Sequence, residues 1–88
     1  MTKYKIVNYF DVWGNEDDGW EVNDLCYSGE IELSEDFKND EILEELKDVG
    51  FLRDDVTMDM LEIDWSDEYF IEIFQADNYR PICRIEKE

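Results

Sequence analysis

The sequence predicts a single α+β domain over residues 1–88, in which one α-helix packs on one face of an antiparallel sheet of about five strands. Several stretches alternate apolar and polar side chains with a period of two, which is typical of strands. A single stretch, residues 39–49, carries apolar side chains at helical spacing. The chain has 88 residues, of which 43 % are hydrophobic, so it suits one small domain and is too apolar for a disordered acidic tail.

The first third of the chain predicts two strands. Residues 3–13 alternate, with Tyr4, Ile6, Phe10 and Val12 on one face. Apolar groups also occupy the other face, which indicates a central strand. Turn-forming residues follow at 14–19, and residues 20–33 form a second strand with an irregularity at Asn23 and Asp24 or at Ser28 and Gly29.

The helix has recognisable ends. Asn39 is expected to cap its N-terminus, although Ser34 offers an earlier start. Gly50 is expected in the left-handed conformation just after the last turn, with Phe51 making the apolar contact that often accompanies it. The apolar stripe consists of Ile42, Leu43, Leu46 and Val49.

Three further strands are expected at residues 61–65, 69–74 and 79–86. A turn at Ser66, Asp67 and Glu68 joins the first two as a hairpin. Pro81 lacks a backbone N–H and therefore places the last strand at a sheet edge or beside a bulge. The expected order is strand, strand, helix, strand, strand, strand.

Charge is the most unusual property of the chain. It contains 26 Asp and Glu, 8 Lys and Arg and no His, so its net charge is −18. Residues 11–77 hold 24 of the acids and only three cations, whereas both terminal segments are slightly basic. Pairing of the first and last strands would gather the few cations in one region. This charge argues against direct binding to DNA, RNA or an anionic membrane.

Regular spacing of the carboxylates suggests a partner that binds nucleic acid. Carboxylates on one strand face recur about every 6.8 Å, and helical residues four apart have Cβ atoms about 5–6 Å apart. Both spacings are close to that of successive phosphates. The expected partner contacts are Glu16, Asp17, Asp18, Asp24, Asp40, Glu41, Glu44, Glu45, Asp48, Glu62, Asp64, Asp67 and Glu68. Solubility alone is the simpler explanation of the same acids.

Most chemical activities are disfavoured by the residues present. With Gly19 at the sixth position of an EF-hand loop, Gly14 and Leu25 occupy the two terminal ligand positions, where neither can serve. A looser cation site is left open among Asp11, Asn15, Asp17, Asp18 and Asp24. Zinc binding and Ser or Cys nucleophiles lack His partners. A carboxylate acid–base pair would need a deep pocket. We therefore expect no enzyme, metal or cofactor.

The cysteines and aromatics permit two interpretations each. Cys26 and Cys83 are expected as reduced, core residues, with a single long-range disulfide as the alternative. Trp13 and Trp20 flank the acidic loop, where they form either partner-binding anchors or a cross-strand pair. Trp65, Tyr69, Phe70 and Phe74 are expected in the core by alternation. No apolar run approaches ~18 residues and no signal peptide is visible, so we expect a cytoplasmic protein.

Residues 9–15, 18–24 and 46–52 resemble a family of small, acidic, uncharacterised proteins of bacterial phages and mobile elements. In size and charge, the chain also resembles in type the anti-CRISPR and anti-restriction inhibitors that imitate DNA. The resemblance implies a stoichiometric blocker of a defence nuclease, such as a CRISPR effector or a restriction enzyme, in the cytoplasm of the bacterial host. An acidic adaptor that binds an ordinary partner through exposed aromatics is the alternative, and the oligomeric state stays open.

Overall fold

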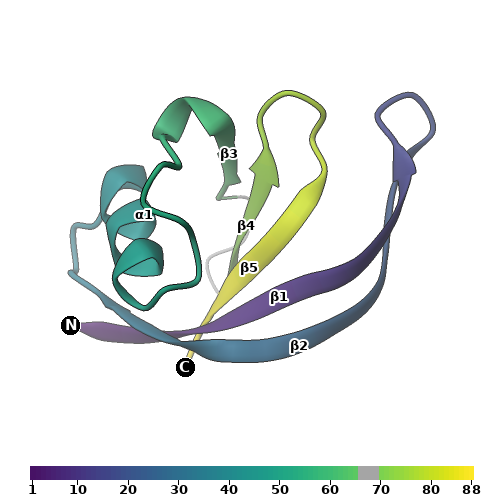
Figure 1. Cartoon of the computed structure of the whole chain (residues 1–88). Coiled ribbons are helices and arrows are strands. Elements are labelled where there is room, and N and C mark those ends of the chain that lie inside the picture. Colours follow the sequence, from purple (N-terminus) through teal and green to yellow (C-terminus); the bar gives the residue numbers. More distant parts are fainter. Residues whose placement is uncertain (66–69) are drawn as a thin grey trace.

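The computed structural model describes residues 1–65 and 70–88, and it confirms the α+β prediction (Figure 1). The expected turn at Ser66, Asp67 and Glu68, together with Tyr69, lies outside the described residues. The sheet has the order β2-β1-β5-β4-β3, and every neighbouring pair is antiparallel. Its elements are β1 (Thr2–Asn15), β2 (Gly19–Leu33), α1 (Asn39–Asp48), a short 3-10 helix η1 (Met58–Met60), β3 (Leu61–Asp64), β4 (Phe70–Gln75) and β5 (Pro81–Lys87).

The first and last strands meet in the middle of the sheet. Ile6 of β1 lies opposite Ile85 of β5, and Val7 lies opposite Arg84. The expected pairing of the termini and the interior position of β1 are therefore confirmed. Of the two positions expected for Pro81, an edge or a bulge, the bulge is confirmed, because β5 lies between β1 and β4. Pro81 opens β5 beside a register shift at Phe74, where a missing N–H is tolerated.

The core lies between α1 and one face of the sheet. Ile6, Leu33, Ile73, Cys83 and Ile85 from four strands are fully buried there. The helix contributes Ile42, Leu43 and Leu46, as its apolar spacing predicts. Val49 was expected in the same stripe, but it is 48 % exposed because it is the residue at which the chain leaves the helix.

The helix ends as predicted but begins differently. Gly50 has φ +80°, and the Phe51 N–H donates to the Leu46 carbonyl at 3.0 Å, which together close the last turn. The N-cap residue is Lys38, so the assignment of Asn39 is wrong. The Asn39 Oδ1 accepts a hydrogen bond from Trp65 Nε1 at 2.6 Å instead. Ser34 does not begin the helix either, because the helix starts five residues later.

Three register shifts interrupt the pairing of β1 with β2. They leave Ser28, Phe10 and Asn23 without an opposite residue. An irregularity was expected in the second strand at one of two places, and the structure has one at each. Because the bulge at Phe10 adds one residue to β1, the strict alternation of β1 fails. Phe10 was expected on the same face as Ile6, yet Phe10 is 56 % exposed and Ile6 is fully buried.

The β1–β2 hairpin extends well beyond the helix. It curves until its tip rises opposite the turn between β4 and β5 (Figure 1). The molecule is consequently elongated, with a longest extent of 38 Å. At the tip, Trp20 Nε1 donates a 2.8 Å hydrogen bond to the carbonyl of Asn78, which ties the hairpin to that turn. Within the described residues, no helix combines the length and apolarity needed to cross a membrane.

Candidate functional site

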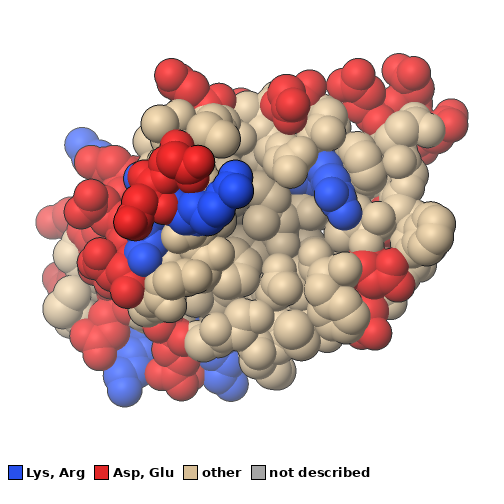
Figure 2. Space-filling model, viewed as in Figure 1, with Lys and Arg blue, Asp and Glu red and all other residues tan. Residues whose placement is uncertain are grey.

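The described carboxylates all lie at the surface. No charged side chain is buried among the described residues, and two ion pairs are found there, Arg53 with Asp55 and Arg84 with Glu86. Figure 2 shows acids over the helix end, along the upper edge and at the hairpin tip, around a largely uncharged centre. The acids therefore form separate acidic regions, which differ in how they are held.

The densest region lies on and beside the helix, and we call it the acidic helix surface. Partial burial raises the pKa of the Glu45 carboxyl, and repulsion from the neighbouring carboxylates raises this pKa further. These neighbours come from α1 and from β2, so the fold brings together acids that are distant in sequence. The acidic helix surface comprises Glu32, Glu41, Glu44, Glu45 and Asp48.

Two of the expected helix contacts also have structural roles. The Glu41 carboxylate accepts hydrogen bonds from the N–H and the hydroxyl of Ser34, both at 2.7 Å. It thereby joins the segment after β2 to the helix. Asp40 Oδ1 accepts a bond from the Glu41 N–H at 3.0 Å, at the helix end where negative charge is favourable. Glu44 and Asp48 are exposed on the outer side of the helix.

The hairpin tip holds its acids on a tight loop. Asn15 Oδ1 accepts hydrogen bonds from the N–H groups of Asp17 and Asp18, at 2.9 and 2.8 Å. This arrangement fixes the loop and leaves Glu16, Asp17 and Asp18 exposed. Farther along β2, Asp24 Oδ1 accepts a bond from the next N–H in the chain. Among the described residues, no group of three or more acids, cysteines or histidines is placed to hold a metal ion.

The two hairpin tryptophans have different environments. Trp13 lies opposite Glu21 and Trp20 lies opposite Gly14, so the expected cross-strand pair of tryptophans does not form. Trp20 is half-buried, and the Arg80 guanidinium lies 6.0 Å from its ring centroid. Trp13 is 65 % exposed, with its Nε1 donating to Asp11 Oδ1 at 2.5 Å. Trp13 is thus the more accessible of the two candidate anchors.

Two further expected contacts lie on β3, at the far edge of the sheet. Glu62 and Asp64 are exposed on β3, while Asp67 and Glu68 lie outside the described residues. Trp65 was expected in the core, but it is 46 % exposed and stacks on Phe37 with the ring centroids 5.0 Å apart. Trp65 does not continue the buried face that begins at Leu61, because β3 ends at Asp64.

Phe70 and Phe74 were also expected in the core, but both are only half-buried. They alternate with Ile71 and Ile73, which face the helix side and are buried. The Arg84 guanidinium lies 5.7 Å from the Phe70 ring centroid. Phe70 thus packs on the sheet face opposite to the helix.

The same reverse face carries a small polar network. The Tyr9 hydroxyl donates to Glu72 Oε2 at 3.2 Å, and Arg84 Nε donates to Glu86 Oε1 at 2.9 Å. Burial, reinforced by the Glu72 carboxylate, raises the pKa of Tyr9 to about 12. This network explains how a tyrosine on the uncovered face is nevertheless buried.

The prediction that both cysteines are core residues is half wrong. Cys83 is fully buried, and burial raises the pKa of its thiol to about 12. Cys26 is exposed on β2, and both thiols are free. The difference arises because the helix covers the middle of β5 and leaves the middle of β2 uncovered.

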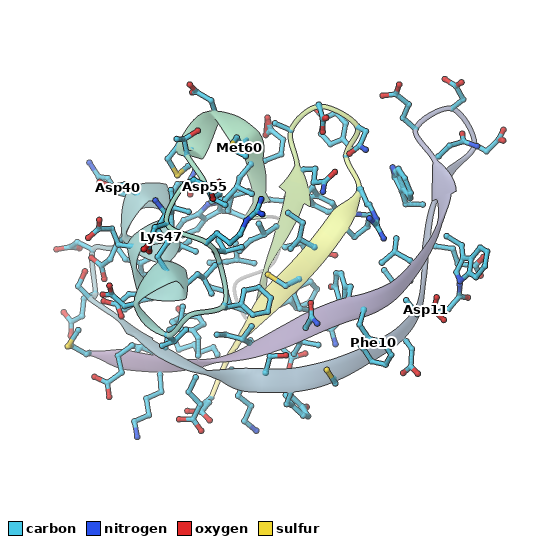
Figure 3. The ribbon with its side chains drawn as sticks, in the orientation of Figure 1. Phe10, Asp11, Asp40, Lys47, Asp55 and Met60 are labelled. Carbon is cyan, nitrogen blue, oxygen red and sulfur yellow. The ribbon has the colours of Figure 1, made fainter. Side chains whose placement is uncertain are left out.

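The sequence reasoning missed a group of exposed apolar side chains on the hairpin. Phe10, Leu25 and Tyr27 are 56 %, 41 % and 67 % exposed. Figure 3 shows Phe10 on the part of β1 that lies away from α1. One signal was available in the sequence: residues 25–29 carry no charge in a chain of which 39 % is charged.

Comparison with protein-family models, curated proteins and solved structures finds no match to this chain. The phage-family resemblance therefore stays a prediction. The site consists of surface carboxylates, which can form ion pairs with cations of a partner, and of a few exposed aromatics.

Proposed function

We propose that this chain is a stoichiometric inhibitor that occupies the nucleic-acid-binding surface of a basic protein, such as a CRISPR effector or a restriction nuclease. The observation that supports this proposal best is the acidic helix surface, where Glu32 of β2 joins the carboxylates of α1. Partial burial, and then repulsion among these carboxylates, raises the pKa of Glu45. A cationic partner would relieve this repulsion, so binding would gain energy that the free protein lacks.

The dimensions of the molecule agree with this proposal. Its 38 Å length corresponds to about eleven base pairs at a rise of ~3.4 Å each. Acids occur at both ends of this length, on the helix and at the hairpin tip (Figure 2). A groove built for a short duplex would therefore contact carboxylates at both ends of the molecule. Such attraction speeds association and weakens as salt is added.

The first experiment identifies the partner. Tagged protein is used to capture binding proteins from a bacterial lysate that contains defence nucleases, at low and at high salt. We expect a nuclease or another nucleic-acid-binding protein, released by salt and displaced by added duplex DNA. A salt-resistant partner without a nucleic-acid role would refute the proposal.

Charge reversal then locates the contact on the captured protein. Replacement of Glu44, Glu45 and Asp48 by Lys changes the net charge by the same amount as replacement of Glu16, Asp17 and Asp18 by Lys. We expect the helix variant to weaken binding more than about a hundredfold, because several close ion pairs are lost, and the tip variant to weaken it less. Equal losses would mean that total charge matters and the helix surface does not.

One observation favours the alternative, an acidic adaptor. Trp13 is 65 % exposed and its indole is oriented by Asp11, which is the arrangement of an interface anchor. In that case Trp13→Ala would weaken binding more than the helix charge reversal does, and salt would have little effect.

A further inference from the structure

The middle of β2 is unusually accessible for a strand. Residues 23–30 are all exposed, although alternate residues point to opposite faces of the sheet. The strand is also the last one in the sheet order and pairs with β1 along its other side. Figure 1 shows no element beyond it. This segment is therefore open on both faces and along one edge, where the backbone groups that do not pair with β1 are accessible, except the Leu25 N–H, which donates to Asp24 Oδ1.

We propose that the outer edge of β2 over residues 23–30 accepts an extended, positively charged segment of a partner protein as a sixth strand. Such strand addition relies on main-chain hydrogen bonds for affinity and on side chains for specificity. The proposal goes beyond the nucleic-acid mimicry above, because it does not require the partner to bind nucleic acid.

The edge between the two bulges of β2 is extended and already paired on its inner side. The bulges at Asn23 and Ser28 bound four consecutive residues that each have a partner on β1, from Asp24 opposite Asp11 to Tyr27 opposite Val7, and the bulge at Phe10 shifts the register between Asp24 and Leu25. Since these four residues already hold extended geometry, an added strand would not have to order them. The entropy cost would fall mainly on the incoming segment.

The charge of β2 selects the kind of strand that can bind. The strand contains four acids, Glu21, Asp24, Glu30 and Glu32, and no cation. The same edge of a second copy would bring identical acids, in a molecule of net charge −18, so self-pairing is disfavoured. A cationic strand meets like charge only from Lys3 and Lys5 of β1, which lie opposite Glu32 and Glu30. The acids therefore protect the edge against its own copy while leaving it open to a basic partner.

The side chains between the acids define the centre of the contact. Leu25 and Tyr27 are 41 % and 67 % exposed, and they stand two apart on one face of the strand. The Lys5 ammonium lies 5.4 Å from the Tyr27 ring centroid, which holds this ring near β1. A suitable partner segment has apolar residues at its centre and Lys or Arg toward its ends.

A synthetic peptide tests the proposal on the full chain. The probe is a peptide of about ten residues with apolar residues at its centre and Lys near both ends. The control peptide has the same sequence and charge, but N-methyl groups on adjacent residues remove main-chain N–H donors along both of its edges. We expect the probe to bind more than about tenfold tighter than the control, because several main-chain hydrogen bonds are lost in the control. Amide exchange should slow at alternate residues of 23–30.

Three results would overturn the proposal. Equal affinity for the two peptides would show that charge alone drives binding. Absence of binding would show that the edge is closed. Protection of the same amides in the free protein, together with a dimer in light scattering, would show that a second copy occupies the edge.

Paired variants locate the charge contribution. The double variant Asp24→Lys, Glu30→Lys should abolish peptide binding. The double variant Glu44→Lys, Asp48→Lys changes the net charge by the same amount and should retain most of the peptide affinity. Circular dichroism confirms that both variants are folded. Equal loss in the two variants would also overturn the assignment to β2. Failure of the nuclease experiment above leaves this result unaffected, because no nuclease is used.

Discussion

The two ends of the β1–β2 hairpin have similar apolar residues and opposite environments. Near the helix, Ile6, Ile31 and Leu33 are at most 2 % exposed. Beyond it on β1, Phe10 is 56 % exposed and Trp13 is 65 % exposed. The difference shows that α1, rather than the composition of the strands, decides which end forms core. The covered end supplies stability, and the open end is available for partners.

Thiol reactivity should show the largest difference between covered and open strands. Cys26 is exposed, whereas Cys83 is fully buried with a thiol pKa of about 12. Cys83 must be exposed by unfolding before it can react. We therefore expect Cys83 to react with a chromogenic disulfide more than about a thousandfold more slowly than Cys26 does. Cys26→Ser isolates the slow thiol, and rapid labelling of that variant would contradict the buried position of β5.

Truncation of leucines should show the next largest contrast. Leu46 is fully buried on α1, while Leu25 is 41 % exposed on β2. We expect Leu46→Ala to lower the free energy of unfolding by about 2–5 kcal/mol and Leu25→Ala to lower it by less than about 1 kcal/mol. Urea titration measures both. Similar losses would mean that the open end is packed as tightly as the covered end.

The tryptophans test how the open end is held in place. Trp20→Phe removes the hydrogen bond to the Asn78 carbonyl and should cost about 1 kcal/mol of stability. Trp13→Phe removes an exposed bond to Asp11 and should change the free energy of unfolding by much less. If the two variants are equally stable, the contact between the hairpin tip and the β4–β5 turn contributes little.

A small pH effect should distinguish the acidic helix surface from the hairpin tip. The folded pKa of Glu45 is raised, so protonation favours the folded state. The contribution of Glu45 to the free energy of unfolding therefore increases as the pH falls from 7 through that pKa, and it decreases as the pH rises. Glu45→Gln should therefore raise the melting temperature at pH 7 and have less effect below pH 4.5, the ordinary pKa of the carboxyl. The change in stability should stay within about 0.5 kcal/mol after solvent screening. Glu16→Gln is the matched control, and an identical pH dependence would indicate a general charge effect.

Local sequence patterns predicted most of the fold because they depend on near neighbours. The Gly50 helix end and the irregularities near Asn23 and Ser28 are of this kind. The errors arise where a residue that is distant in the sequence makes a contact with the residue in question. Asn39 loses its capping role because Trp65, 26 residues away, donates to its side chain. The sequence also could not decide between an edge and a bulge for Pro81, because the central position of β5 depends on its pairing with β1.

The candidate site was predictable to a smaller extent. Spacing along α1 places Glu44 and Asp48 on one helix face, but the addition of Glu32 requires the packing of β2 beside the helix. The hydrogen bonds that the Glu41 carboxylate accepts from Ser34 were likewise not predictable from the spacing along the helix. Exposure of Phe10 depends on a bulge that shifts the alternation by one residue.

The central pairing of β1 with β5 has a consequence for how the chain folds. Ile6 meets Ile85, so this contact joins residues almost the full chain apart. The β1–β2 hairpin and the β3-β4-β5 meander have short loops and can form early, but each exposes apolar surface until they join. High contact order of this kind slows folding. On the ribosome, the sheet can be completed only after residues 81–87 have emerged, and until then β1 presents an unpaired edge to its surroundings.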